Sequence, residues 1–236
     1  MSVWSDLGAF IARMSSTALG GVVEAVRTVF EGDPATRRSV AFSVAMIALS
    51  AKMAKADGVV TQDEVRAFHE IFHVPDSERR NVSRLYEIAR QDVAGYEAYA
   101  QRMTSLCGNG EPGCPVMEDI LDGLFHIAKA DGVLHEREVS FLRDVSGIFG
   151  FDEHGFRRIM ARHADLGDAD PYAVLGLERG ASFETVRKRY RELVKENHPD
   201  KLVAHGLPEE FMVIAHDRIS AINDAYGAIE KEMAAA

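Results

Sequence analysis

A line of basic side chains that ends at a His-Pro-Asp tripeptide is the feature of this sequence best suited to chemistry with a partner. Arg187, Arg191 and Lys195 recur every four residues, so they share one face of a predicted helix. The line ends at residues 198–200, where the proline cannot continue the helix and predicts a projecting loop. Such cations guide the encounter with an acidic protein surface, and an aspartate can accept a hydrogen bond from a partner arginine. The alternative is that the charged stripe is only a solvated helix face. The predicted contact residues are Arg187, Lys188, Tyr190, Arg191, Lys195, His198, Pro199, Asp200 and Lys201.

An acidic turn that occurs twice is the second candidate for chemistry. Residues 54–65 and 128–139 have mostly the same sequence, and each carries an aspartate at a helix end, where the helix dipole disfavours negative charge. A divalent cation would compensate, since hard cations take carboxylate oxygens from a turn and from the helix that follows. The candidate metal ligands are Asp57, Glu64, Asp131 and Glu138, with Asp63 and Glu136 as alternatives.

A simpler interpretation of the acidic turns needs no metal. Each aspartate can cap its own turn and lies close to a lysine, Lys55 or Lys129, while Thr61 and Glu64 form a capping box for the next helix. The stretch also lacks the alternating ligands of an EF-hand. No cofactor is therefore certain, and a divalent cation stays a candidate.

Residues 69–73 match the zinc-binding pattern H-E-x-x-H, in which His69 and His73 would bind the metal and Glu70 would activate water. Residues 143–147, the corresponding stretch of the second copy, do not keep the pattern, and a Val-Pro pair ends the first helix at once. We therefore expect solvated histidines at a helix end rather than a metalloprotease.

Helical periodicity fills almost every window of the chain, and no stretch alternates for long enough to make a strand, so we predict an all-α fold. The repeat predicts a duplicated helix-turn-helix bundle, and the last third predicts a small helical hairpin. Residues 166–171 form a polar turn that marks the boundary. The predicted domains are an amphipathic N-terminal helix over residues 1–33, the bundle over residues 34–165 and the hairpin over residues 170–236. The residues expected inside the hairpin are Val186, Tyr190, Leu193, Val194, Phe211, Ala215, Ile219, Ile222, Tyr226 and Ile229.

Charge and composition limit the classes of partner. The chain has 236 residues and a formal net charge of -10, which argues against nucleic acid or an anionic membrane as the main partner. The uncharged run of residues 14–23 has about half of the ~20 residues that a membrane span needs. The N-terminal helix is expected to dock on the protein, with membrane-surface contact through Trp4 and Phe10 as the alternative. Cys107 and Cys114 are too few for a disulfide framework and fit a reducing compartment, so cytoplasm is the default.

The doubled acidic turn carries a family resemblance. The stretch from Ala35 to His163, with its two Lys-Ala-Asp-Gly turns, is similar to the tellurite-resistance TerB-like helical domain. Members of that family have clustered acidic residues that are suspected of binding metal. The resemblance therefore implies interaction or sensing, and a metal-binding or stress-sensing module is the alternative function for the chain.

The C-terminal block resembles a J-domain. Tyr-Ala-Val-Leu-Gly-Leu at residues 172–177, the basic helix, His-Pro-Asp at 198–200 and Ile-Asn-Asp-Ala-Tyr at 222–226 occur in the order of that family. Lys-Leu directly after the tripeptide, Gly-Leu-Pro at 206–208 and the TerB-like stretch upstream are similar to the DjlA-type family of bacterial DnaJ-like co-chaperones.

This second resemblance implies a co-chaperone of a DnaK-class heat-shock ATPase rather than an enzyme. In such proteins the basic helix docks on an acidic surface of the chaperone, and the His-Pro-Asp loop accelerates hydrolysis of the chaperone's ATP. The family carries an N-terminal membrane anchor, which we expect this chain to lack, so we predict a cytoplasmic protein with peripheral inner-membrane contact as an alternative. Its client proteins are unknown, and the TerB-like domain or the N-terminal helix is expected to recruit them.

Overall fold

The computed structural model describes residues 3–13, 34–56, 68–69, 72–91, 95–107, 111–130, 132–164, 170–205 and 208–235. Every regular element in this part of the chain is a helix, so the predicted all-α fold is confirmed. The N-terminal block contains α1 (Val3–Arg13), α3 (Pro34–Ala56), α5 (Asp76–Gln91), α6 (Tyr96–Met103), the short 3-10 helix η1 (Thr104–Leu106), α7 (Pro115–Ala128), α8 (Glu136–Ile148) and α9 (Glu153–Arg162). The C-terminal block contains α10 (Pro171–Leu175), α11 (Phe183–Glu196), α12 (Pro199–His205), the 3-10 helix η2 (Glu209–Phe211) and α13 (Met212–Ala234).

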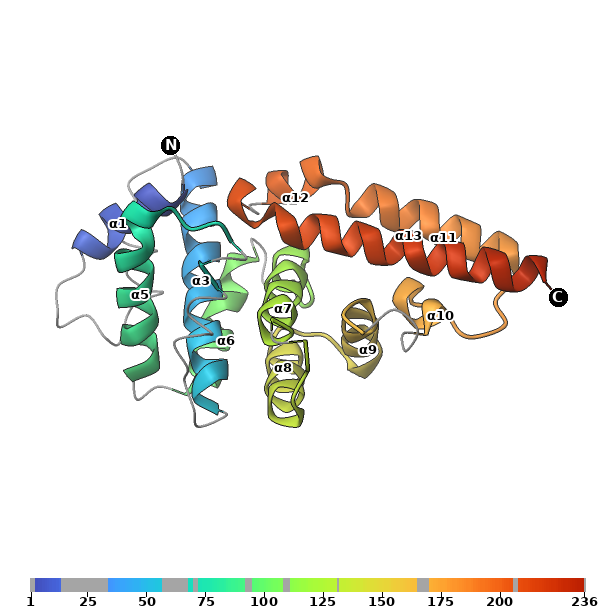
Figure 1. Cartoon of the computed structure of the whole chain (residues 1–236), viewed down its shortest axis with the longest axis horizontal. Helices are drawn as coiled ribbons and strands as arrows, with labels where there is room; N and C mark the ends of the chain where they lie inside the picture. The colour runs from blue at the N-terminus through green and yellow to red at the C-terminus, as the bar shows by residue number, and fades with distance from the viewer. Residues whose placement is uncertain are drawn as a thin grey trace.

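Helix α3 is the centre of the N-terminal block, with α1, α5, α6 and α7 packed around it (Figure 1). All of its side chains from residue 40 to residue 54 are buried, as is typical of a helix that other helices surround. The buried hydroxyls of Ser43 and Ser50 donate to the carbonyl oxygens of Ser39 and Met46, one turn earlier, so they need no other partner. Helix α3 therefore provides the wall against which α7, and with it the site described below, is placed.

Helix α1 docks on α3 and α5 through its apolar face. The buried side chains of that face are Val3, Trp4, Leu7 and Ile11. The Trp4 ring centroid lies 6.4 Å from that of Phe68 and 5.4 Å from that of Phe211, and Trp4 is 1% exposed. The expected docking of this helix on the protein is therefore present, and the alternative, membrane contact through Trp4, is wrong. The Phe10 side chain and residues 14–33 lie outside the part that the structure describes. Within the described residues, no helix combines the length and the apolar character needed to cross a membrane.

The C-terminal block has a small core of its own between α10, α11 and α13 (Figure 1). Its buried side chains are Tyr172, Val174, Leu175, Val186, Leu193, Ile222, Ala225 and Ile229. Helix α10 ends at Gly176, whose φ of +68° is a left-handed conformation that favours glycine. The expected pairing of two long helices with Val186 and Leu193 facing inward is therefore present.

Helix α13 belongs to both cores, which the sequence did not predict. It has 23 residues against 14 in α11, so its first turns extend past the end of α11 and meet α7. Phe211, Ile214 and Ala215 are buried in the core of the N-terminal block, together with Leu202 of α12. The prediction that Phe211 and Ala215 face α11 is wrong, because helical spacing marks an apolar face but not the partner at each turn.

Cys107 and Cys114 form a disulfide in the structure. Their Cα atoms lie 6.1 Å apart, a separation that suits the bond. The backbone N–H of Gly113 donates to the carbonyl oxygen of Phe149 at 2.8 Å, so the bridged loop is attached to the end of α8. The two cysteines therefore no longer support the prediction of a reducing compartment.

Candidate functional site

Helix α11 presents the predicted basic side chains on its outer face. Ser182 caps the start of the helix, because its Oγ accepts the backbone N–H of Thr185 at 3.2 Å, and the buried Val186 and Leu193 form the inner face. The exposed cations of the outer face, called the basic stripe below, are Arg187, Lys188, Arg191 and Lys195. The structure thus brings these four predicted residues together on one surface.

The basic stripe is available to a partner. Among the described residues, no ion pair involves its four cations or the exposed Lys201. Arg189, which lies beside the stripe, behaves differently, because it pairs with Glu192 at 3.4 Å and with Glu196 at 3.6 Å. The nearby carboxylates therefore balance Arg189 and leave the charge of the stripe in place.

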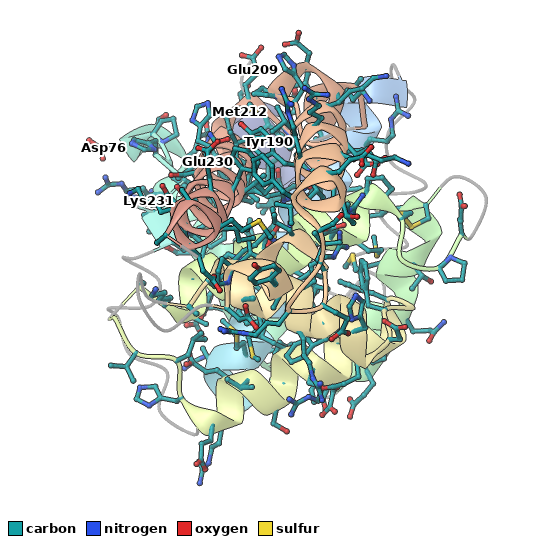
Figure 2. The ribbon with its side chains drawn as sticks, turned by 90° about the vertical axis from the view of Figure 1, so that its right-hand side faces the viewer. Asp76, Tyr190, Glu209, Met212, Glu230 and Lys231 are labelled. Atoms are coloured by element: carbon teal, nitrogen blue, oxygen red, sulfur yellow. A yellow bond between two sulfur atoms is a disulfide. The ribbon has the colours of Figure 1, made fainter. Side chains whose placement is uncertain are left out.

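Tyr190 lies between α11 and α13 rather than on the stripe (Figure 2). Its hydroxyl donates to Asn223 Oδ1 at 3.0 Å, and its ring stacks on Tyr226 with the centroids 4.2 Å apart. This predicted contact residue therefore already uses its polar group within the hairpin.

His198, Pro199 and Asp200 form a corner between α11 and α12, called the HPD corner below, rather than the projecting loop that the sequence predicts. Pro199 is the first residue of α12, and the N–H groups of Lys201 and Leu202 donate to the carbonyl oxygen of His198 at 2.8 and 3.3 Å. Proline suits this position because its φ is already helical and it lacks an N–H that would have no partner. The side chains of His198 and Asp200 are 58% and 90% exposed, and His198 Nδ1 accepts the Asp200 N–H at 3.3 Å. The shape of the tripeptide differs from the prediction, but both polar side chains still face solvent.

Two residues that the sequence analysis missed, Asn197 and Arg218, hold the HPD corner from behind. Asn197 Nδ2 donates to a carbonyl oxygen one turn earlier in α11 at 2.8 Å, and its Oδ1 accepts Arg218 Nη1 at 3.0 Å. Arg218 of α13 also reaches α7, where Nε donates to Asp122 Oδ2 at 2.5 Å and Nη2 lies 2.7 Å from Asp119 Oδ1. A chain of polar contacts therefore runs from the N-terminal block to the residue that precedes His198.

Arg218 belongs to a buried group of charges between α7, α9 and α13. Asp122 also lies 3.5 Å from Arg162 Nη1 and 2.7 Å from His163 Nε2. Glu118 Oε1 lies 2.5 Å from Arg162 Nη2. The members of this group, called the charge cluster below, are Glu118, Asp119, Asp122, Arg158, Arg162, His163 and Arg218. Each buried charge has an opposite charge beside it, which offsets part of the cost of removing it from water.

The two aspartates of the charge cluster differ in their titration. Burial alone would raise the pKa of Asp122, but Arg162 and Arg218 outweigh it and hold the pKa well below its ordinary value. Burial raises the pKa of Asp119 to about 6, against the opposing charge of Arg218. Asp122 therefore stays ionised to lower pH than Asp119, which takes up a proton more readily.

One signal in the sequence could have revealed the charge cluster. Asp119 and Asp122 lie three residues apart among the apolar residues of α7, and both are buried. A buried carboxylate needs a cation or a set of donors. The cation that meets Asp122 comes from Arg218, 96 residues later, so local spacing could not identify it.

Of the four predicted metal ligands, the structure describes only Glu138. Asp57, Glu64 and Asp131 lie outside the described residues. Glu138 Oε2 accepts the backbone N–H of His135 at 2.9 Å at the start of α8, which is the capping role predicted for Glu64 in the first copy. No group of three or more metal-ligating side chains gathers in the described part of the chain. A divalent cation in the acidic turns stays a prediction from the sequence.

His69 and His73 do not share the solvated environment that the sequence predicts. His69 is buried, and its Nε2 lies 3.2 Å from Ser83 Oγ of α5. Burial lowers the pKa of His69, and the charge of Arg79 adds to this effect. His73 is exposed, with a φ of +48°, while Glu70 lies outside the described residues. The expectation is therefore wrong for His69, because α5 covers its ring.

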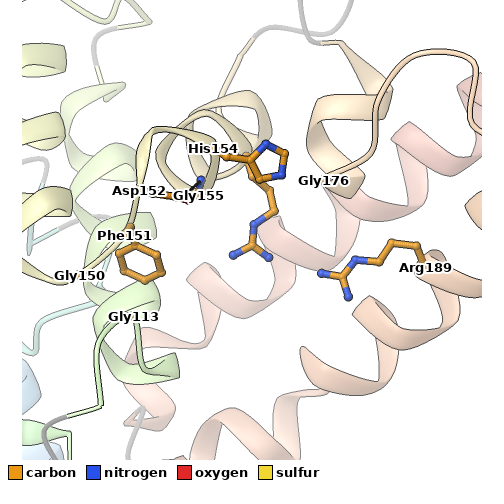
Figure 3. Close-up of a pocket in the computed structure, with 9 residues that line it drawn as sticks. Gly113, Gly150, Phe151, Asp152, His154, Gly155, Gly176 and Arg189 are labelled. Carbon is orange, nitrogen blue, oxygen red and sulfur yellow. Dashed lines mark hydrogen bonds between the residues drawn. The ribbon is translucent and has the colours of Figure 1, made fainter.

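A pocket of about 470 Å³ lies at the seam between the two blocks (Figure 3). It is lined by the turn before α9, the end of α10 and the side chains of Arg158 and Arg189. Both arginines already lie close to carboxylates, Glu118 in one case and Glu192 in the other. Because these charges are balanced inside the chain, we assign no function to the pocket.

Two family models match the chain. The model of tellurite resistance protein TerB matches residues 43–161, and the model of the DnaJ domain matches residues 170–233. The second match contains the basic stripe and the HPD corner. No solved structure matches the chain significantly.

Curated relatives match the chain, two of the three named here over both blocks. The co-chaperone protein DjlA of Photobacterium profundum is 29% identical over 221 residues, which cover 83% of this chain and 79% of the relative. DjlA of Coxiella burnetii is 30% identical over 201 residues, or 76% of this chain and 73% of the relative. DjlA of Vibrio cholerae is 48% identical over 64 residues, which cover 27% of this chain and 22% of the relative. The chain therefore belongs to the DjlA family of co-chaperones, with a TerB domain followed by a C-terminal DnaJ domain.

Proposed function

We propose that this chain stimulates ATP hydrolysis by a DnaK-class chaperone, with the basic stripe and the HPD corner as its contact surface. One observation carries the proposal: the stripe, which has no ion pair among the described residues, leads directly to the exposed side chains of His198 and Asp200. Such a surface suits an acidic partner, whose carboxylates contact the stripe while Asp200 accepts a bond from a partner arginine. The DnaJ domain and the co-chaperone relatives support a DnaK-class partner.

Each part of this surface has its own task in the proposed mechanism. The basic stripe accelerates and orients the encounter, because charges at the rim of an interface act mainly on association. His198 and Asp200 then contact the ATPase, and Pro199 sets their spacing by starting α12. The phosphate bond is broken in the active site of the partner, so the chain acts as a regulator rather than as an enzyme.

The TerB domain is proposed to recruit client proteins. The apolar face of helix α1 is buried in the core and is not available to a client, so the proposal places recruitment on the TerB domain rather than on this helix. Cytoplasmic localisation and a peripheral inner-membrane contact stay predictions from the sequence.

The variant His198→Gln tests the mechanism. It is expected to reduce the stimulated rate of ATP hydrolysis by about tenfold or more, equivalent to at least ~1.4 kcal/mol of barrier, because the HPD corner loses its imidazole. The fold should not change, since the His198 side chain is 58% exposed. The measurement is single-turnover hydrolysis by purified DnaK with and without the full chain, together with thermal unfolding. The control is His154→Gln, which removes another exposed histidine, in the first turn of α9. Full stimulation by His198→Gln would contradict the proposal.

The variant Arg191→Glu tests the basic stripe. We expect the concentration of chain that gives half-maximal stimulation to rise by about tenfold, while the maximal rate stays close to that of the wild type. Added salt should raise the same concentration for the wild type, because ions screen exposed charges. The matched control is Arg157→Glu on α9, whose side chain is 69% exposed. Equal weakening by both variants would mean that net charge, and not the stripe, attracts the partner.

A further inference from the structure

We propose that the TerB domain braces the HPD corner: Asp119 and Asp122 of α7 hold Arg218, and Arg218 holds Asn197, the residue before His198. In this role Asn197, Arg218 and the two aspartates are positioning residues, which set the geometry of the corner without touching the partner. The inference rests on the proposed function and adds to it a role for the TerB domain in the stimulation itself.

The first support is the geometry of Arg218. This side chain is 3% exposed, and its guanidinium contacts two helices at once, with Asp122 and Asp119 on α7 and Asn197 at the end of α11. A guanidinium is a rigid plane of donors, so its contacts on α7 determine the direction in which Nη1 meets Asn197. The position of the TerB domain is thereby transmitted to the end of α11.

The second support is the environment of Asn197. Its side chain is 8% exposed, and both ends of its amide are used: Nδ2 donates to the carbonyl oxygen of Leu193, and Oδ1 accepts from Arg218. An amide with both ends bonded cannot rotate without losing a bond. Because the next residue is His198, the direction in which the chain leaves α11 is fixed at this point.

The third support lies on the other side of the HPD corner. Leu202 of α12 is 1% exposed and packs into the core of the TerB domain, where α12 contacts α7. Figure 1 shows α12 and the near end of α13 over α7. The exposed residues 198–200 therefore lie between two anchors, Asn197 and Leu202, and both anchors lead to the same helix.

A purely structural role for these contacts makes a different prediction. If the charge cluster only joins the two domains, the loss of the bond between Asn197 and Arg218 changes stability but leaves the folded chain fully active. If the contacts position the HPD corner, the folded variant binds DnaK normally but stimulates hydrolysis poorly. The two roles are distinguished by measuring the maximal stimulated rate and the concentration of chain that gives half of that rate as separate quantities.

The experiment titrates DnaK with the full chain carrying Asn197→Ala, in single-turnover hydrolysis. The maximal stimulation is expected to fall about tenfold, since a small misplacement of a contact group can cost this much, with an unchanged half-maximal concentration because the basic stripe is intact. Arg218→Lys should act in the same direction, because one ammonium cannot replace the fork that joins Asp122 and Asn197. Asn197→Asp keeps the oxygen that accepts from Arg218 and is expected to restore most of the stimulation.

The control is Ser182→Ala, which removes the cap at the opposite end of α11 and should leave the maximal stimulation unchanged. A second readout needs no DnaK: the amide NMR signals of Asp200 and Lys201 in the full chain should shift in Asn197→Ala and not in Ser182→Ala. If the wild type fails to stimulate DnaK, the proposed function is wrong, and the amide signals alone decide whether the brace exists. Maximal stimulation at the wild-type level in Asn197→Ala and Arg218→Lys would overturn the brace, as would unshifted amide signals.

Discussion

Replacement of Asp122 by asparagine is expected to lower the free energy of unfolding by about 3–5 kcal/mol, because it leaves buried arginines without their shared carboxylate. Asp122 is 2% exposed and lies beside Arg162, Arg218 and His163. Burial alone would raise its pKa, but the two arginines outweigh burial and keep Asp122 ionised, so the charge is part of the folded structure. Urea unfolding at pH 7.5, followed by circular dichroism, measures the loss.

Asp119→Asn provides a matched comparison with the opposite expectation. Burial raises the pKa of Asp119 to about 6, above the ordinary value of 3.8, so folding makes the charged form of this group less favourable than it is in the unfolded chain. A neutral amide should therefore change stability at pH 7.5 by at most about 1 kcal/mol in the unfavourable direction, or increase it. An equal loss in Asp119→Asn and Asp122→Asn would contradict the opposite pKa shifts of the two aspartates.

The pKa shifts of the two aspartates also predict that their contributions to stability change in opposite directions as the pH falls. As the pH falls from 6 to 4, folded Asp119 takes up a proton that the unfolded chain does not yet bind, so this group makes folding more favourable. Asp122 has a lowered pKa, so it contributes stability above the ordinary value of 3.8 that is lost only as the pH falls further. The difference in stability between wild type and Asp119→Asn should therefore move in favour of the wild type between pH 6 and pH 4. His163 and the arginines are present in both proteins, so the comparison isolates Asp119.

Phe211→Ala is expected to lower the free energy of unfolding by about 3–5 kcal/mol, because it removes a ring from the aromatic core between the domains. Phe211 is 0% exposed, and its ring centroid lies 5.4 Å from Trp4, 5.1 Å from Phe42 and 4.5 Å from Phe72. Removal of the ring leaves a cavity where α1, α3 and the segment before α13 meet. Trp4 is the single tryptophan of the chain, so its fluorescence reports unfolding at this place.

The control for Phe211→Ala is Val203→Ala in α12, whose side chain is 43% exposed. A surface change of this kind should alter stability by no more than about 0.5 kcal/mol. If Phe211→Ala unfolds at the same urea concentration as the wild type, Phe211 does not connect the DnaJ domain to the TerB core.

The sequence predicts the surface of the candidate site better than its support. Spacing alone places Val186 and Leu193 inside and Arg187 and Arg191 outside, because one helical period decides both faces. The shape of the HPD corner was missed, because Pro199 can end one helix and also begin the next. In the structure α12 is held by Leu202, which packs in the core of the other domain, and that contact is not visible in local spacing.

The contacts that support the HPD corner could not be predicted from the sequence, for a different reason. Arg218 contacts Asp122 and Asn197, which lie 96 and 21 residues away in the chain, so no local pattern joins them. The wrong assignment of Phe211 and Ala215 to the hairpin has the same origin, since an apolar face is visible in the sequence and its partner is not. The pairing of Cys107 with Cys114 also depends on how the chain folds back rather than on composition.

Helix α13 is seated by its first turns in one core and by its last turns in the other, so it sets the direction of the DnaJ domain relative to the TerB domain. A helix of 23 residues is about 35 Å long and does not bend freely, unlike a glycine-rich tether. If the TerB domain holds a client, as proposed, that client is presented at a set distance and direction from the HPD corner, and its effective concentration near DnaK depends on orientation rather than on the length of a flexible linker. On that proposal, clients that cannot approach from this direction gain nothing from being bound, and the rigidity of α13 selects among clients by their geometry.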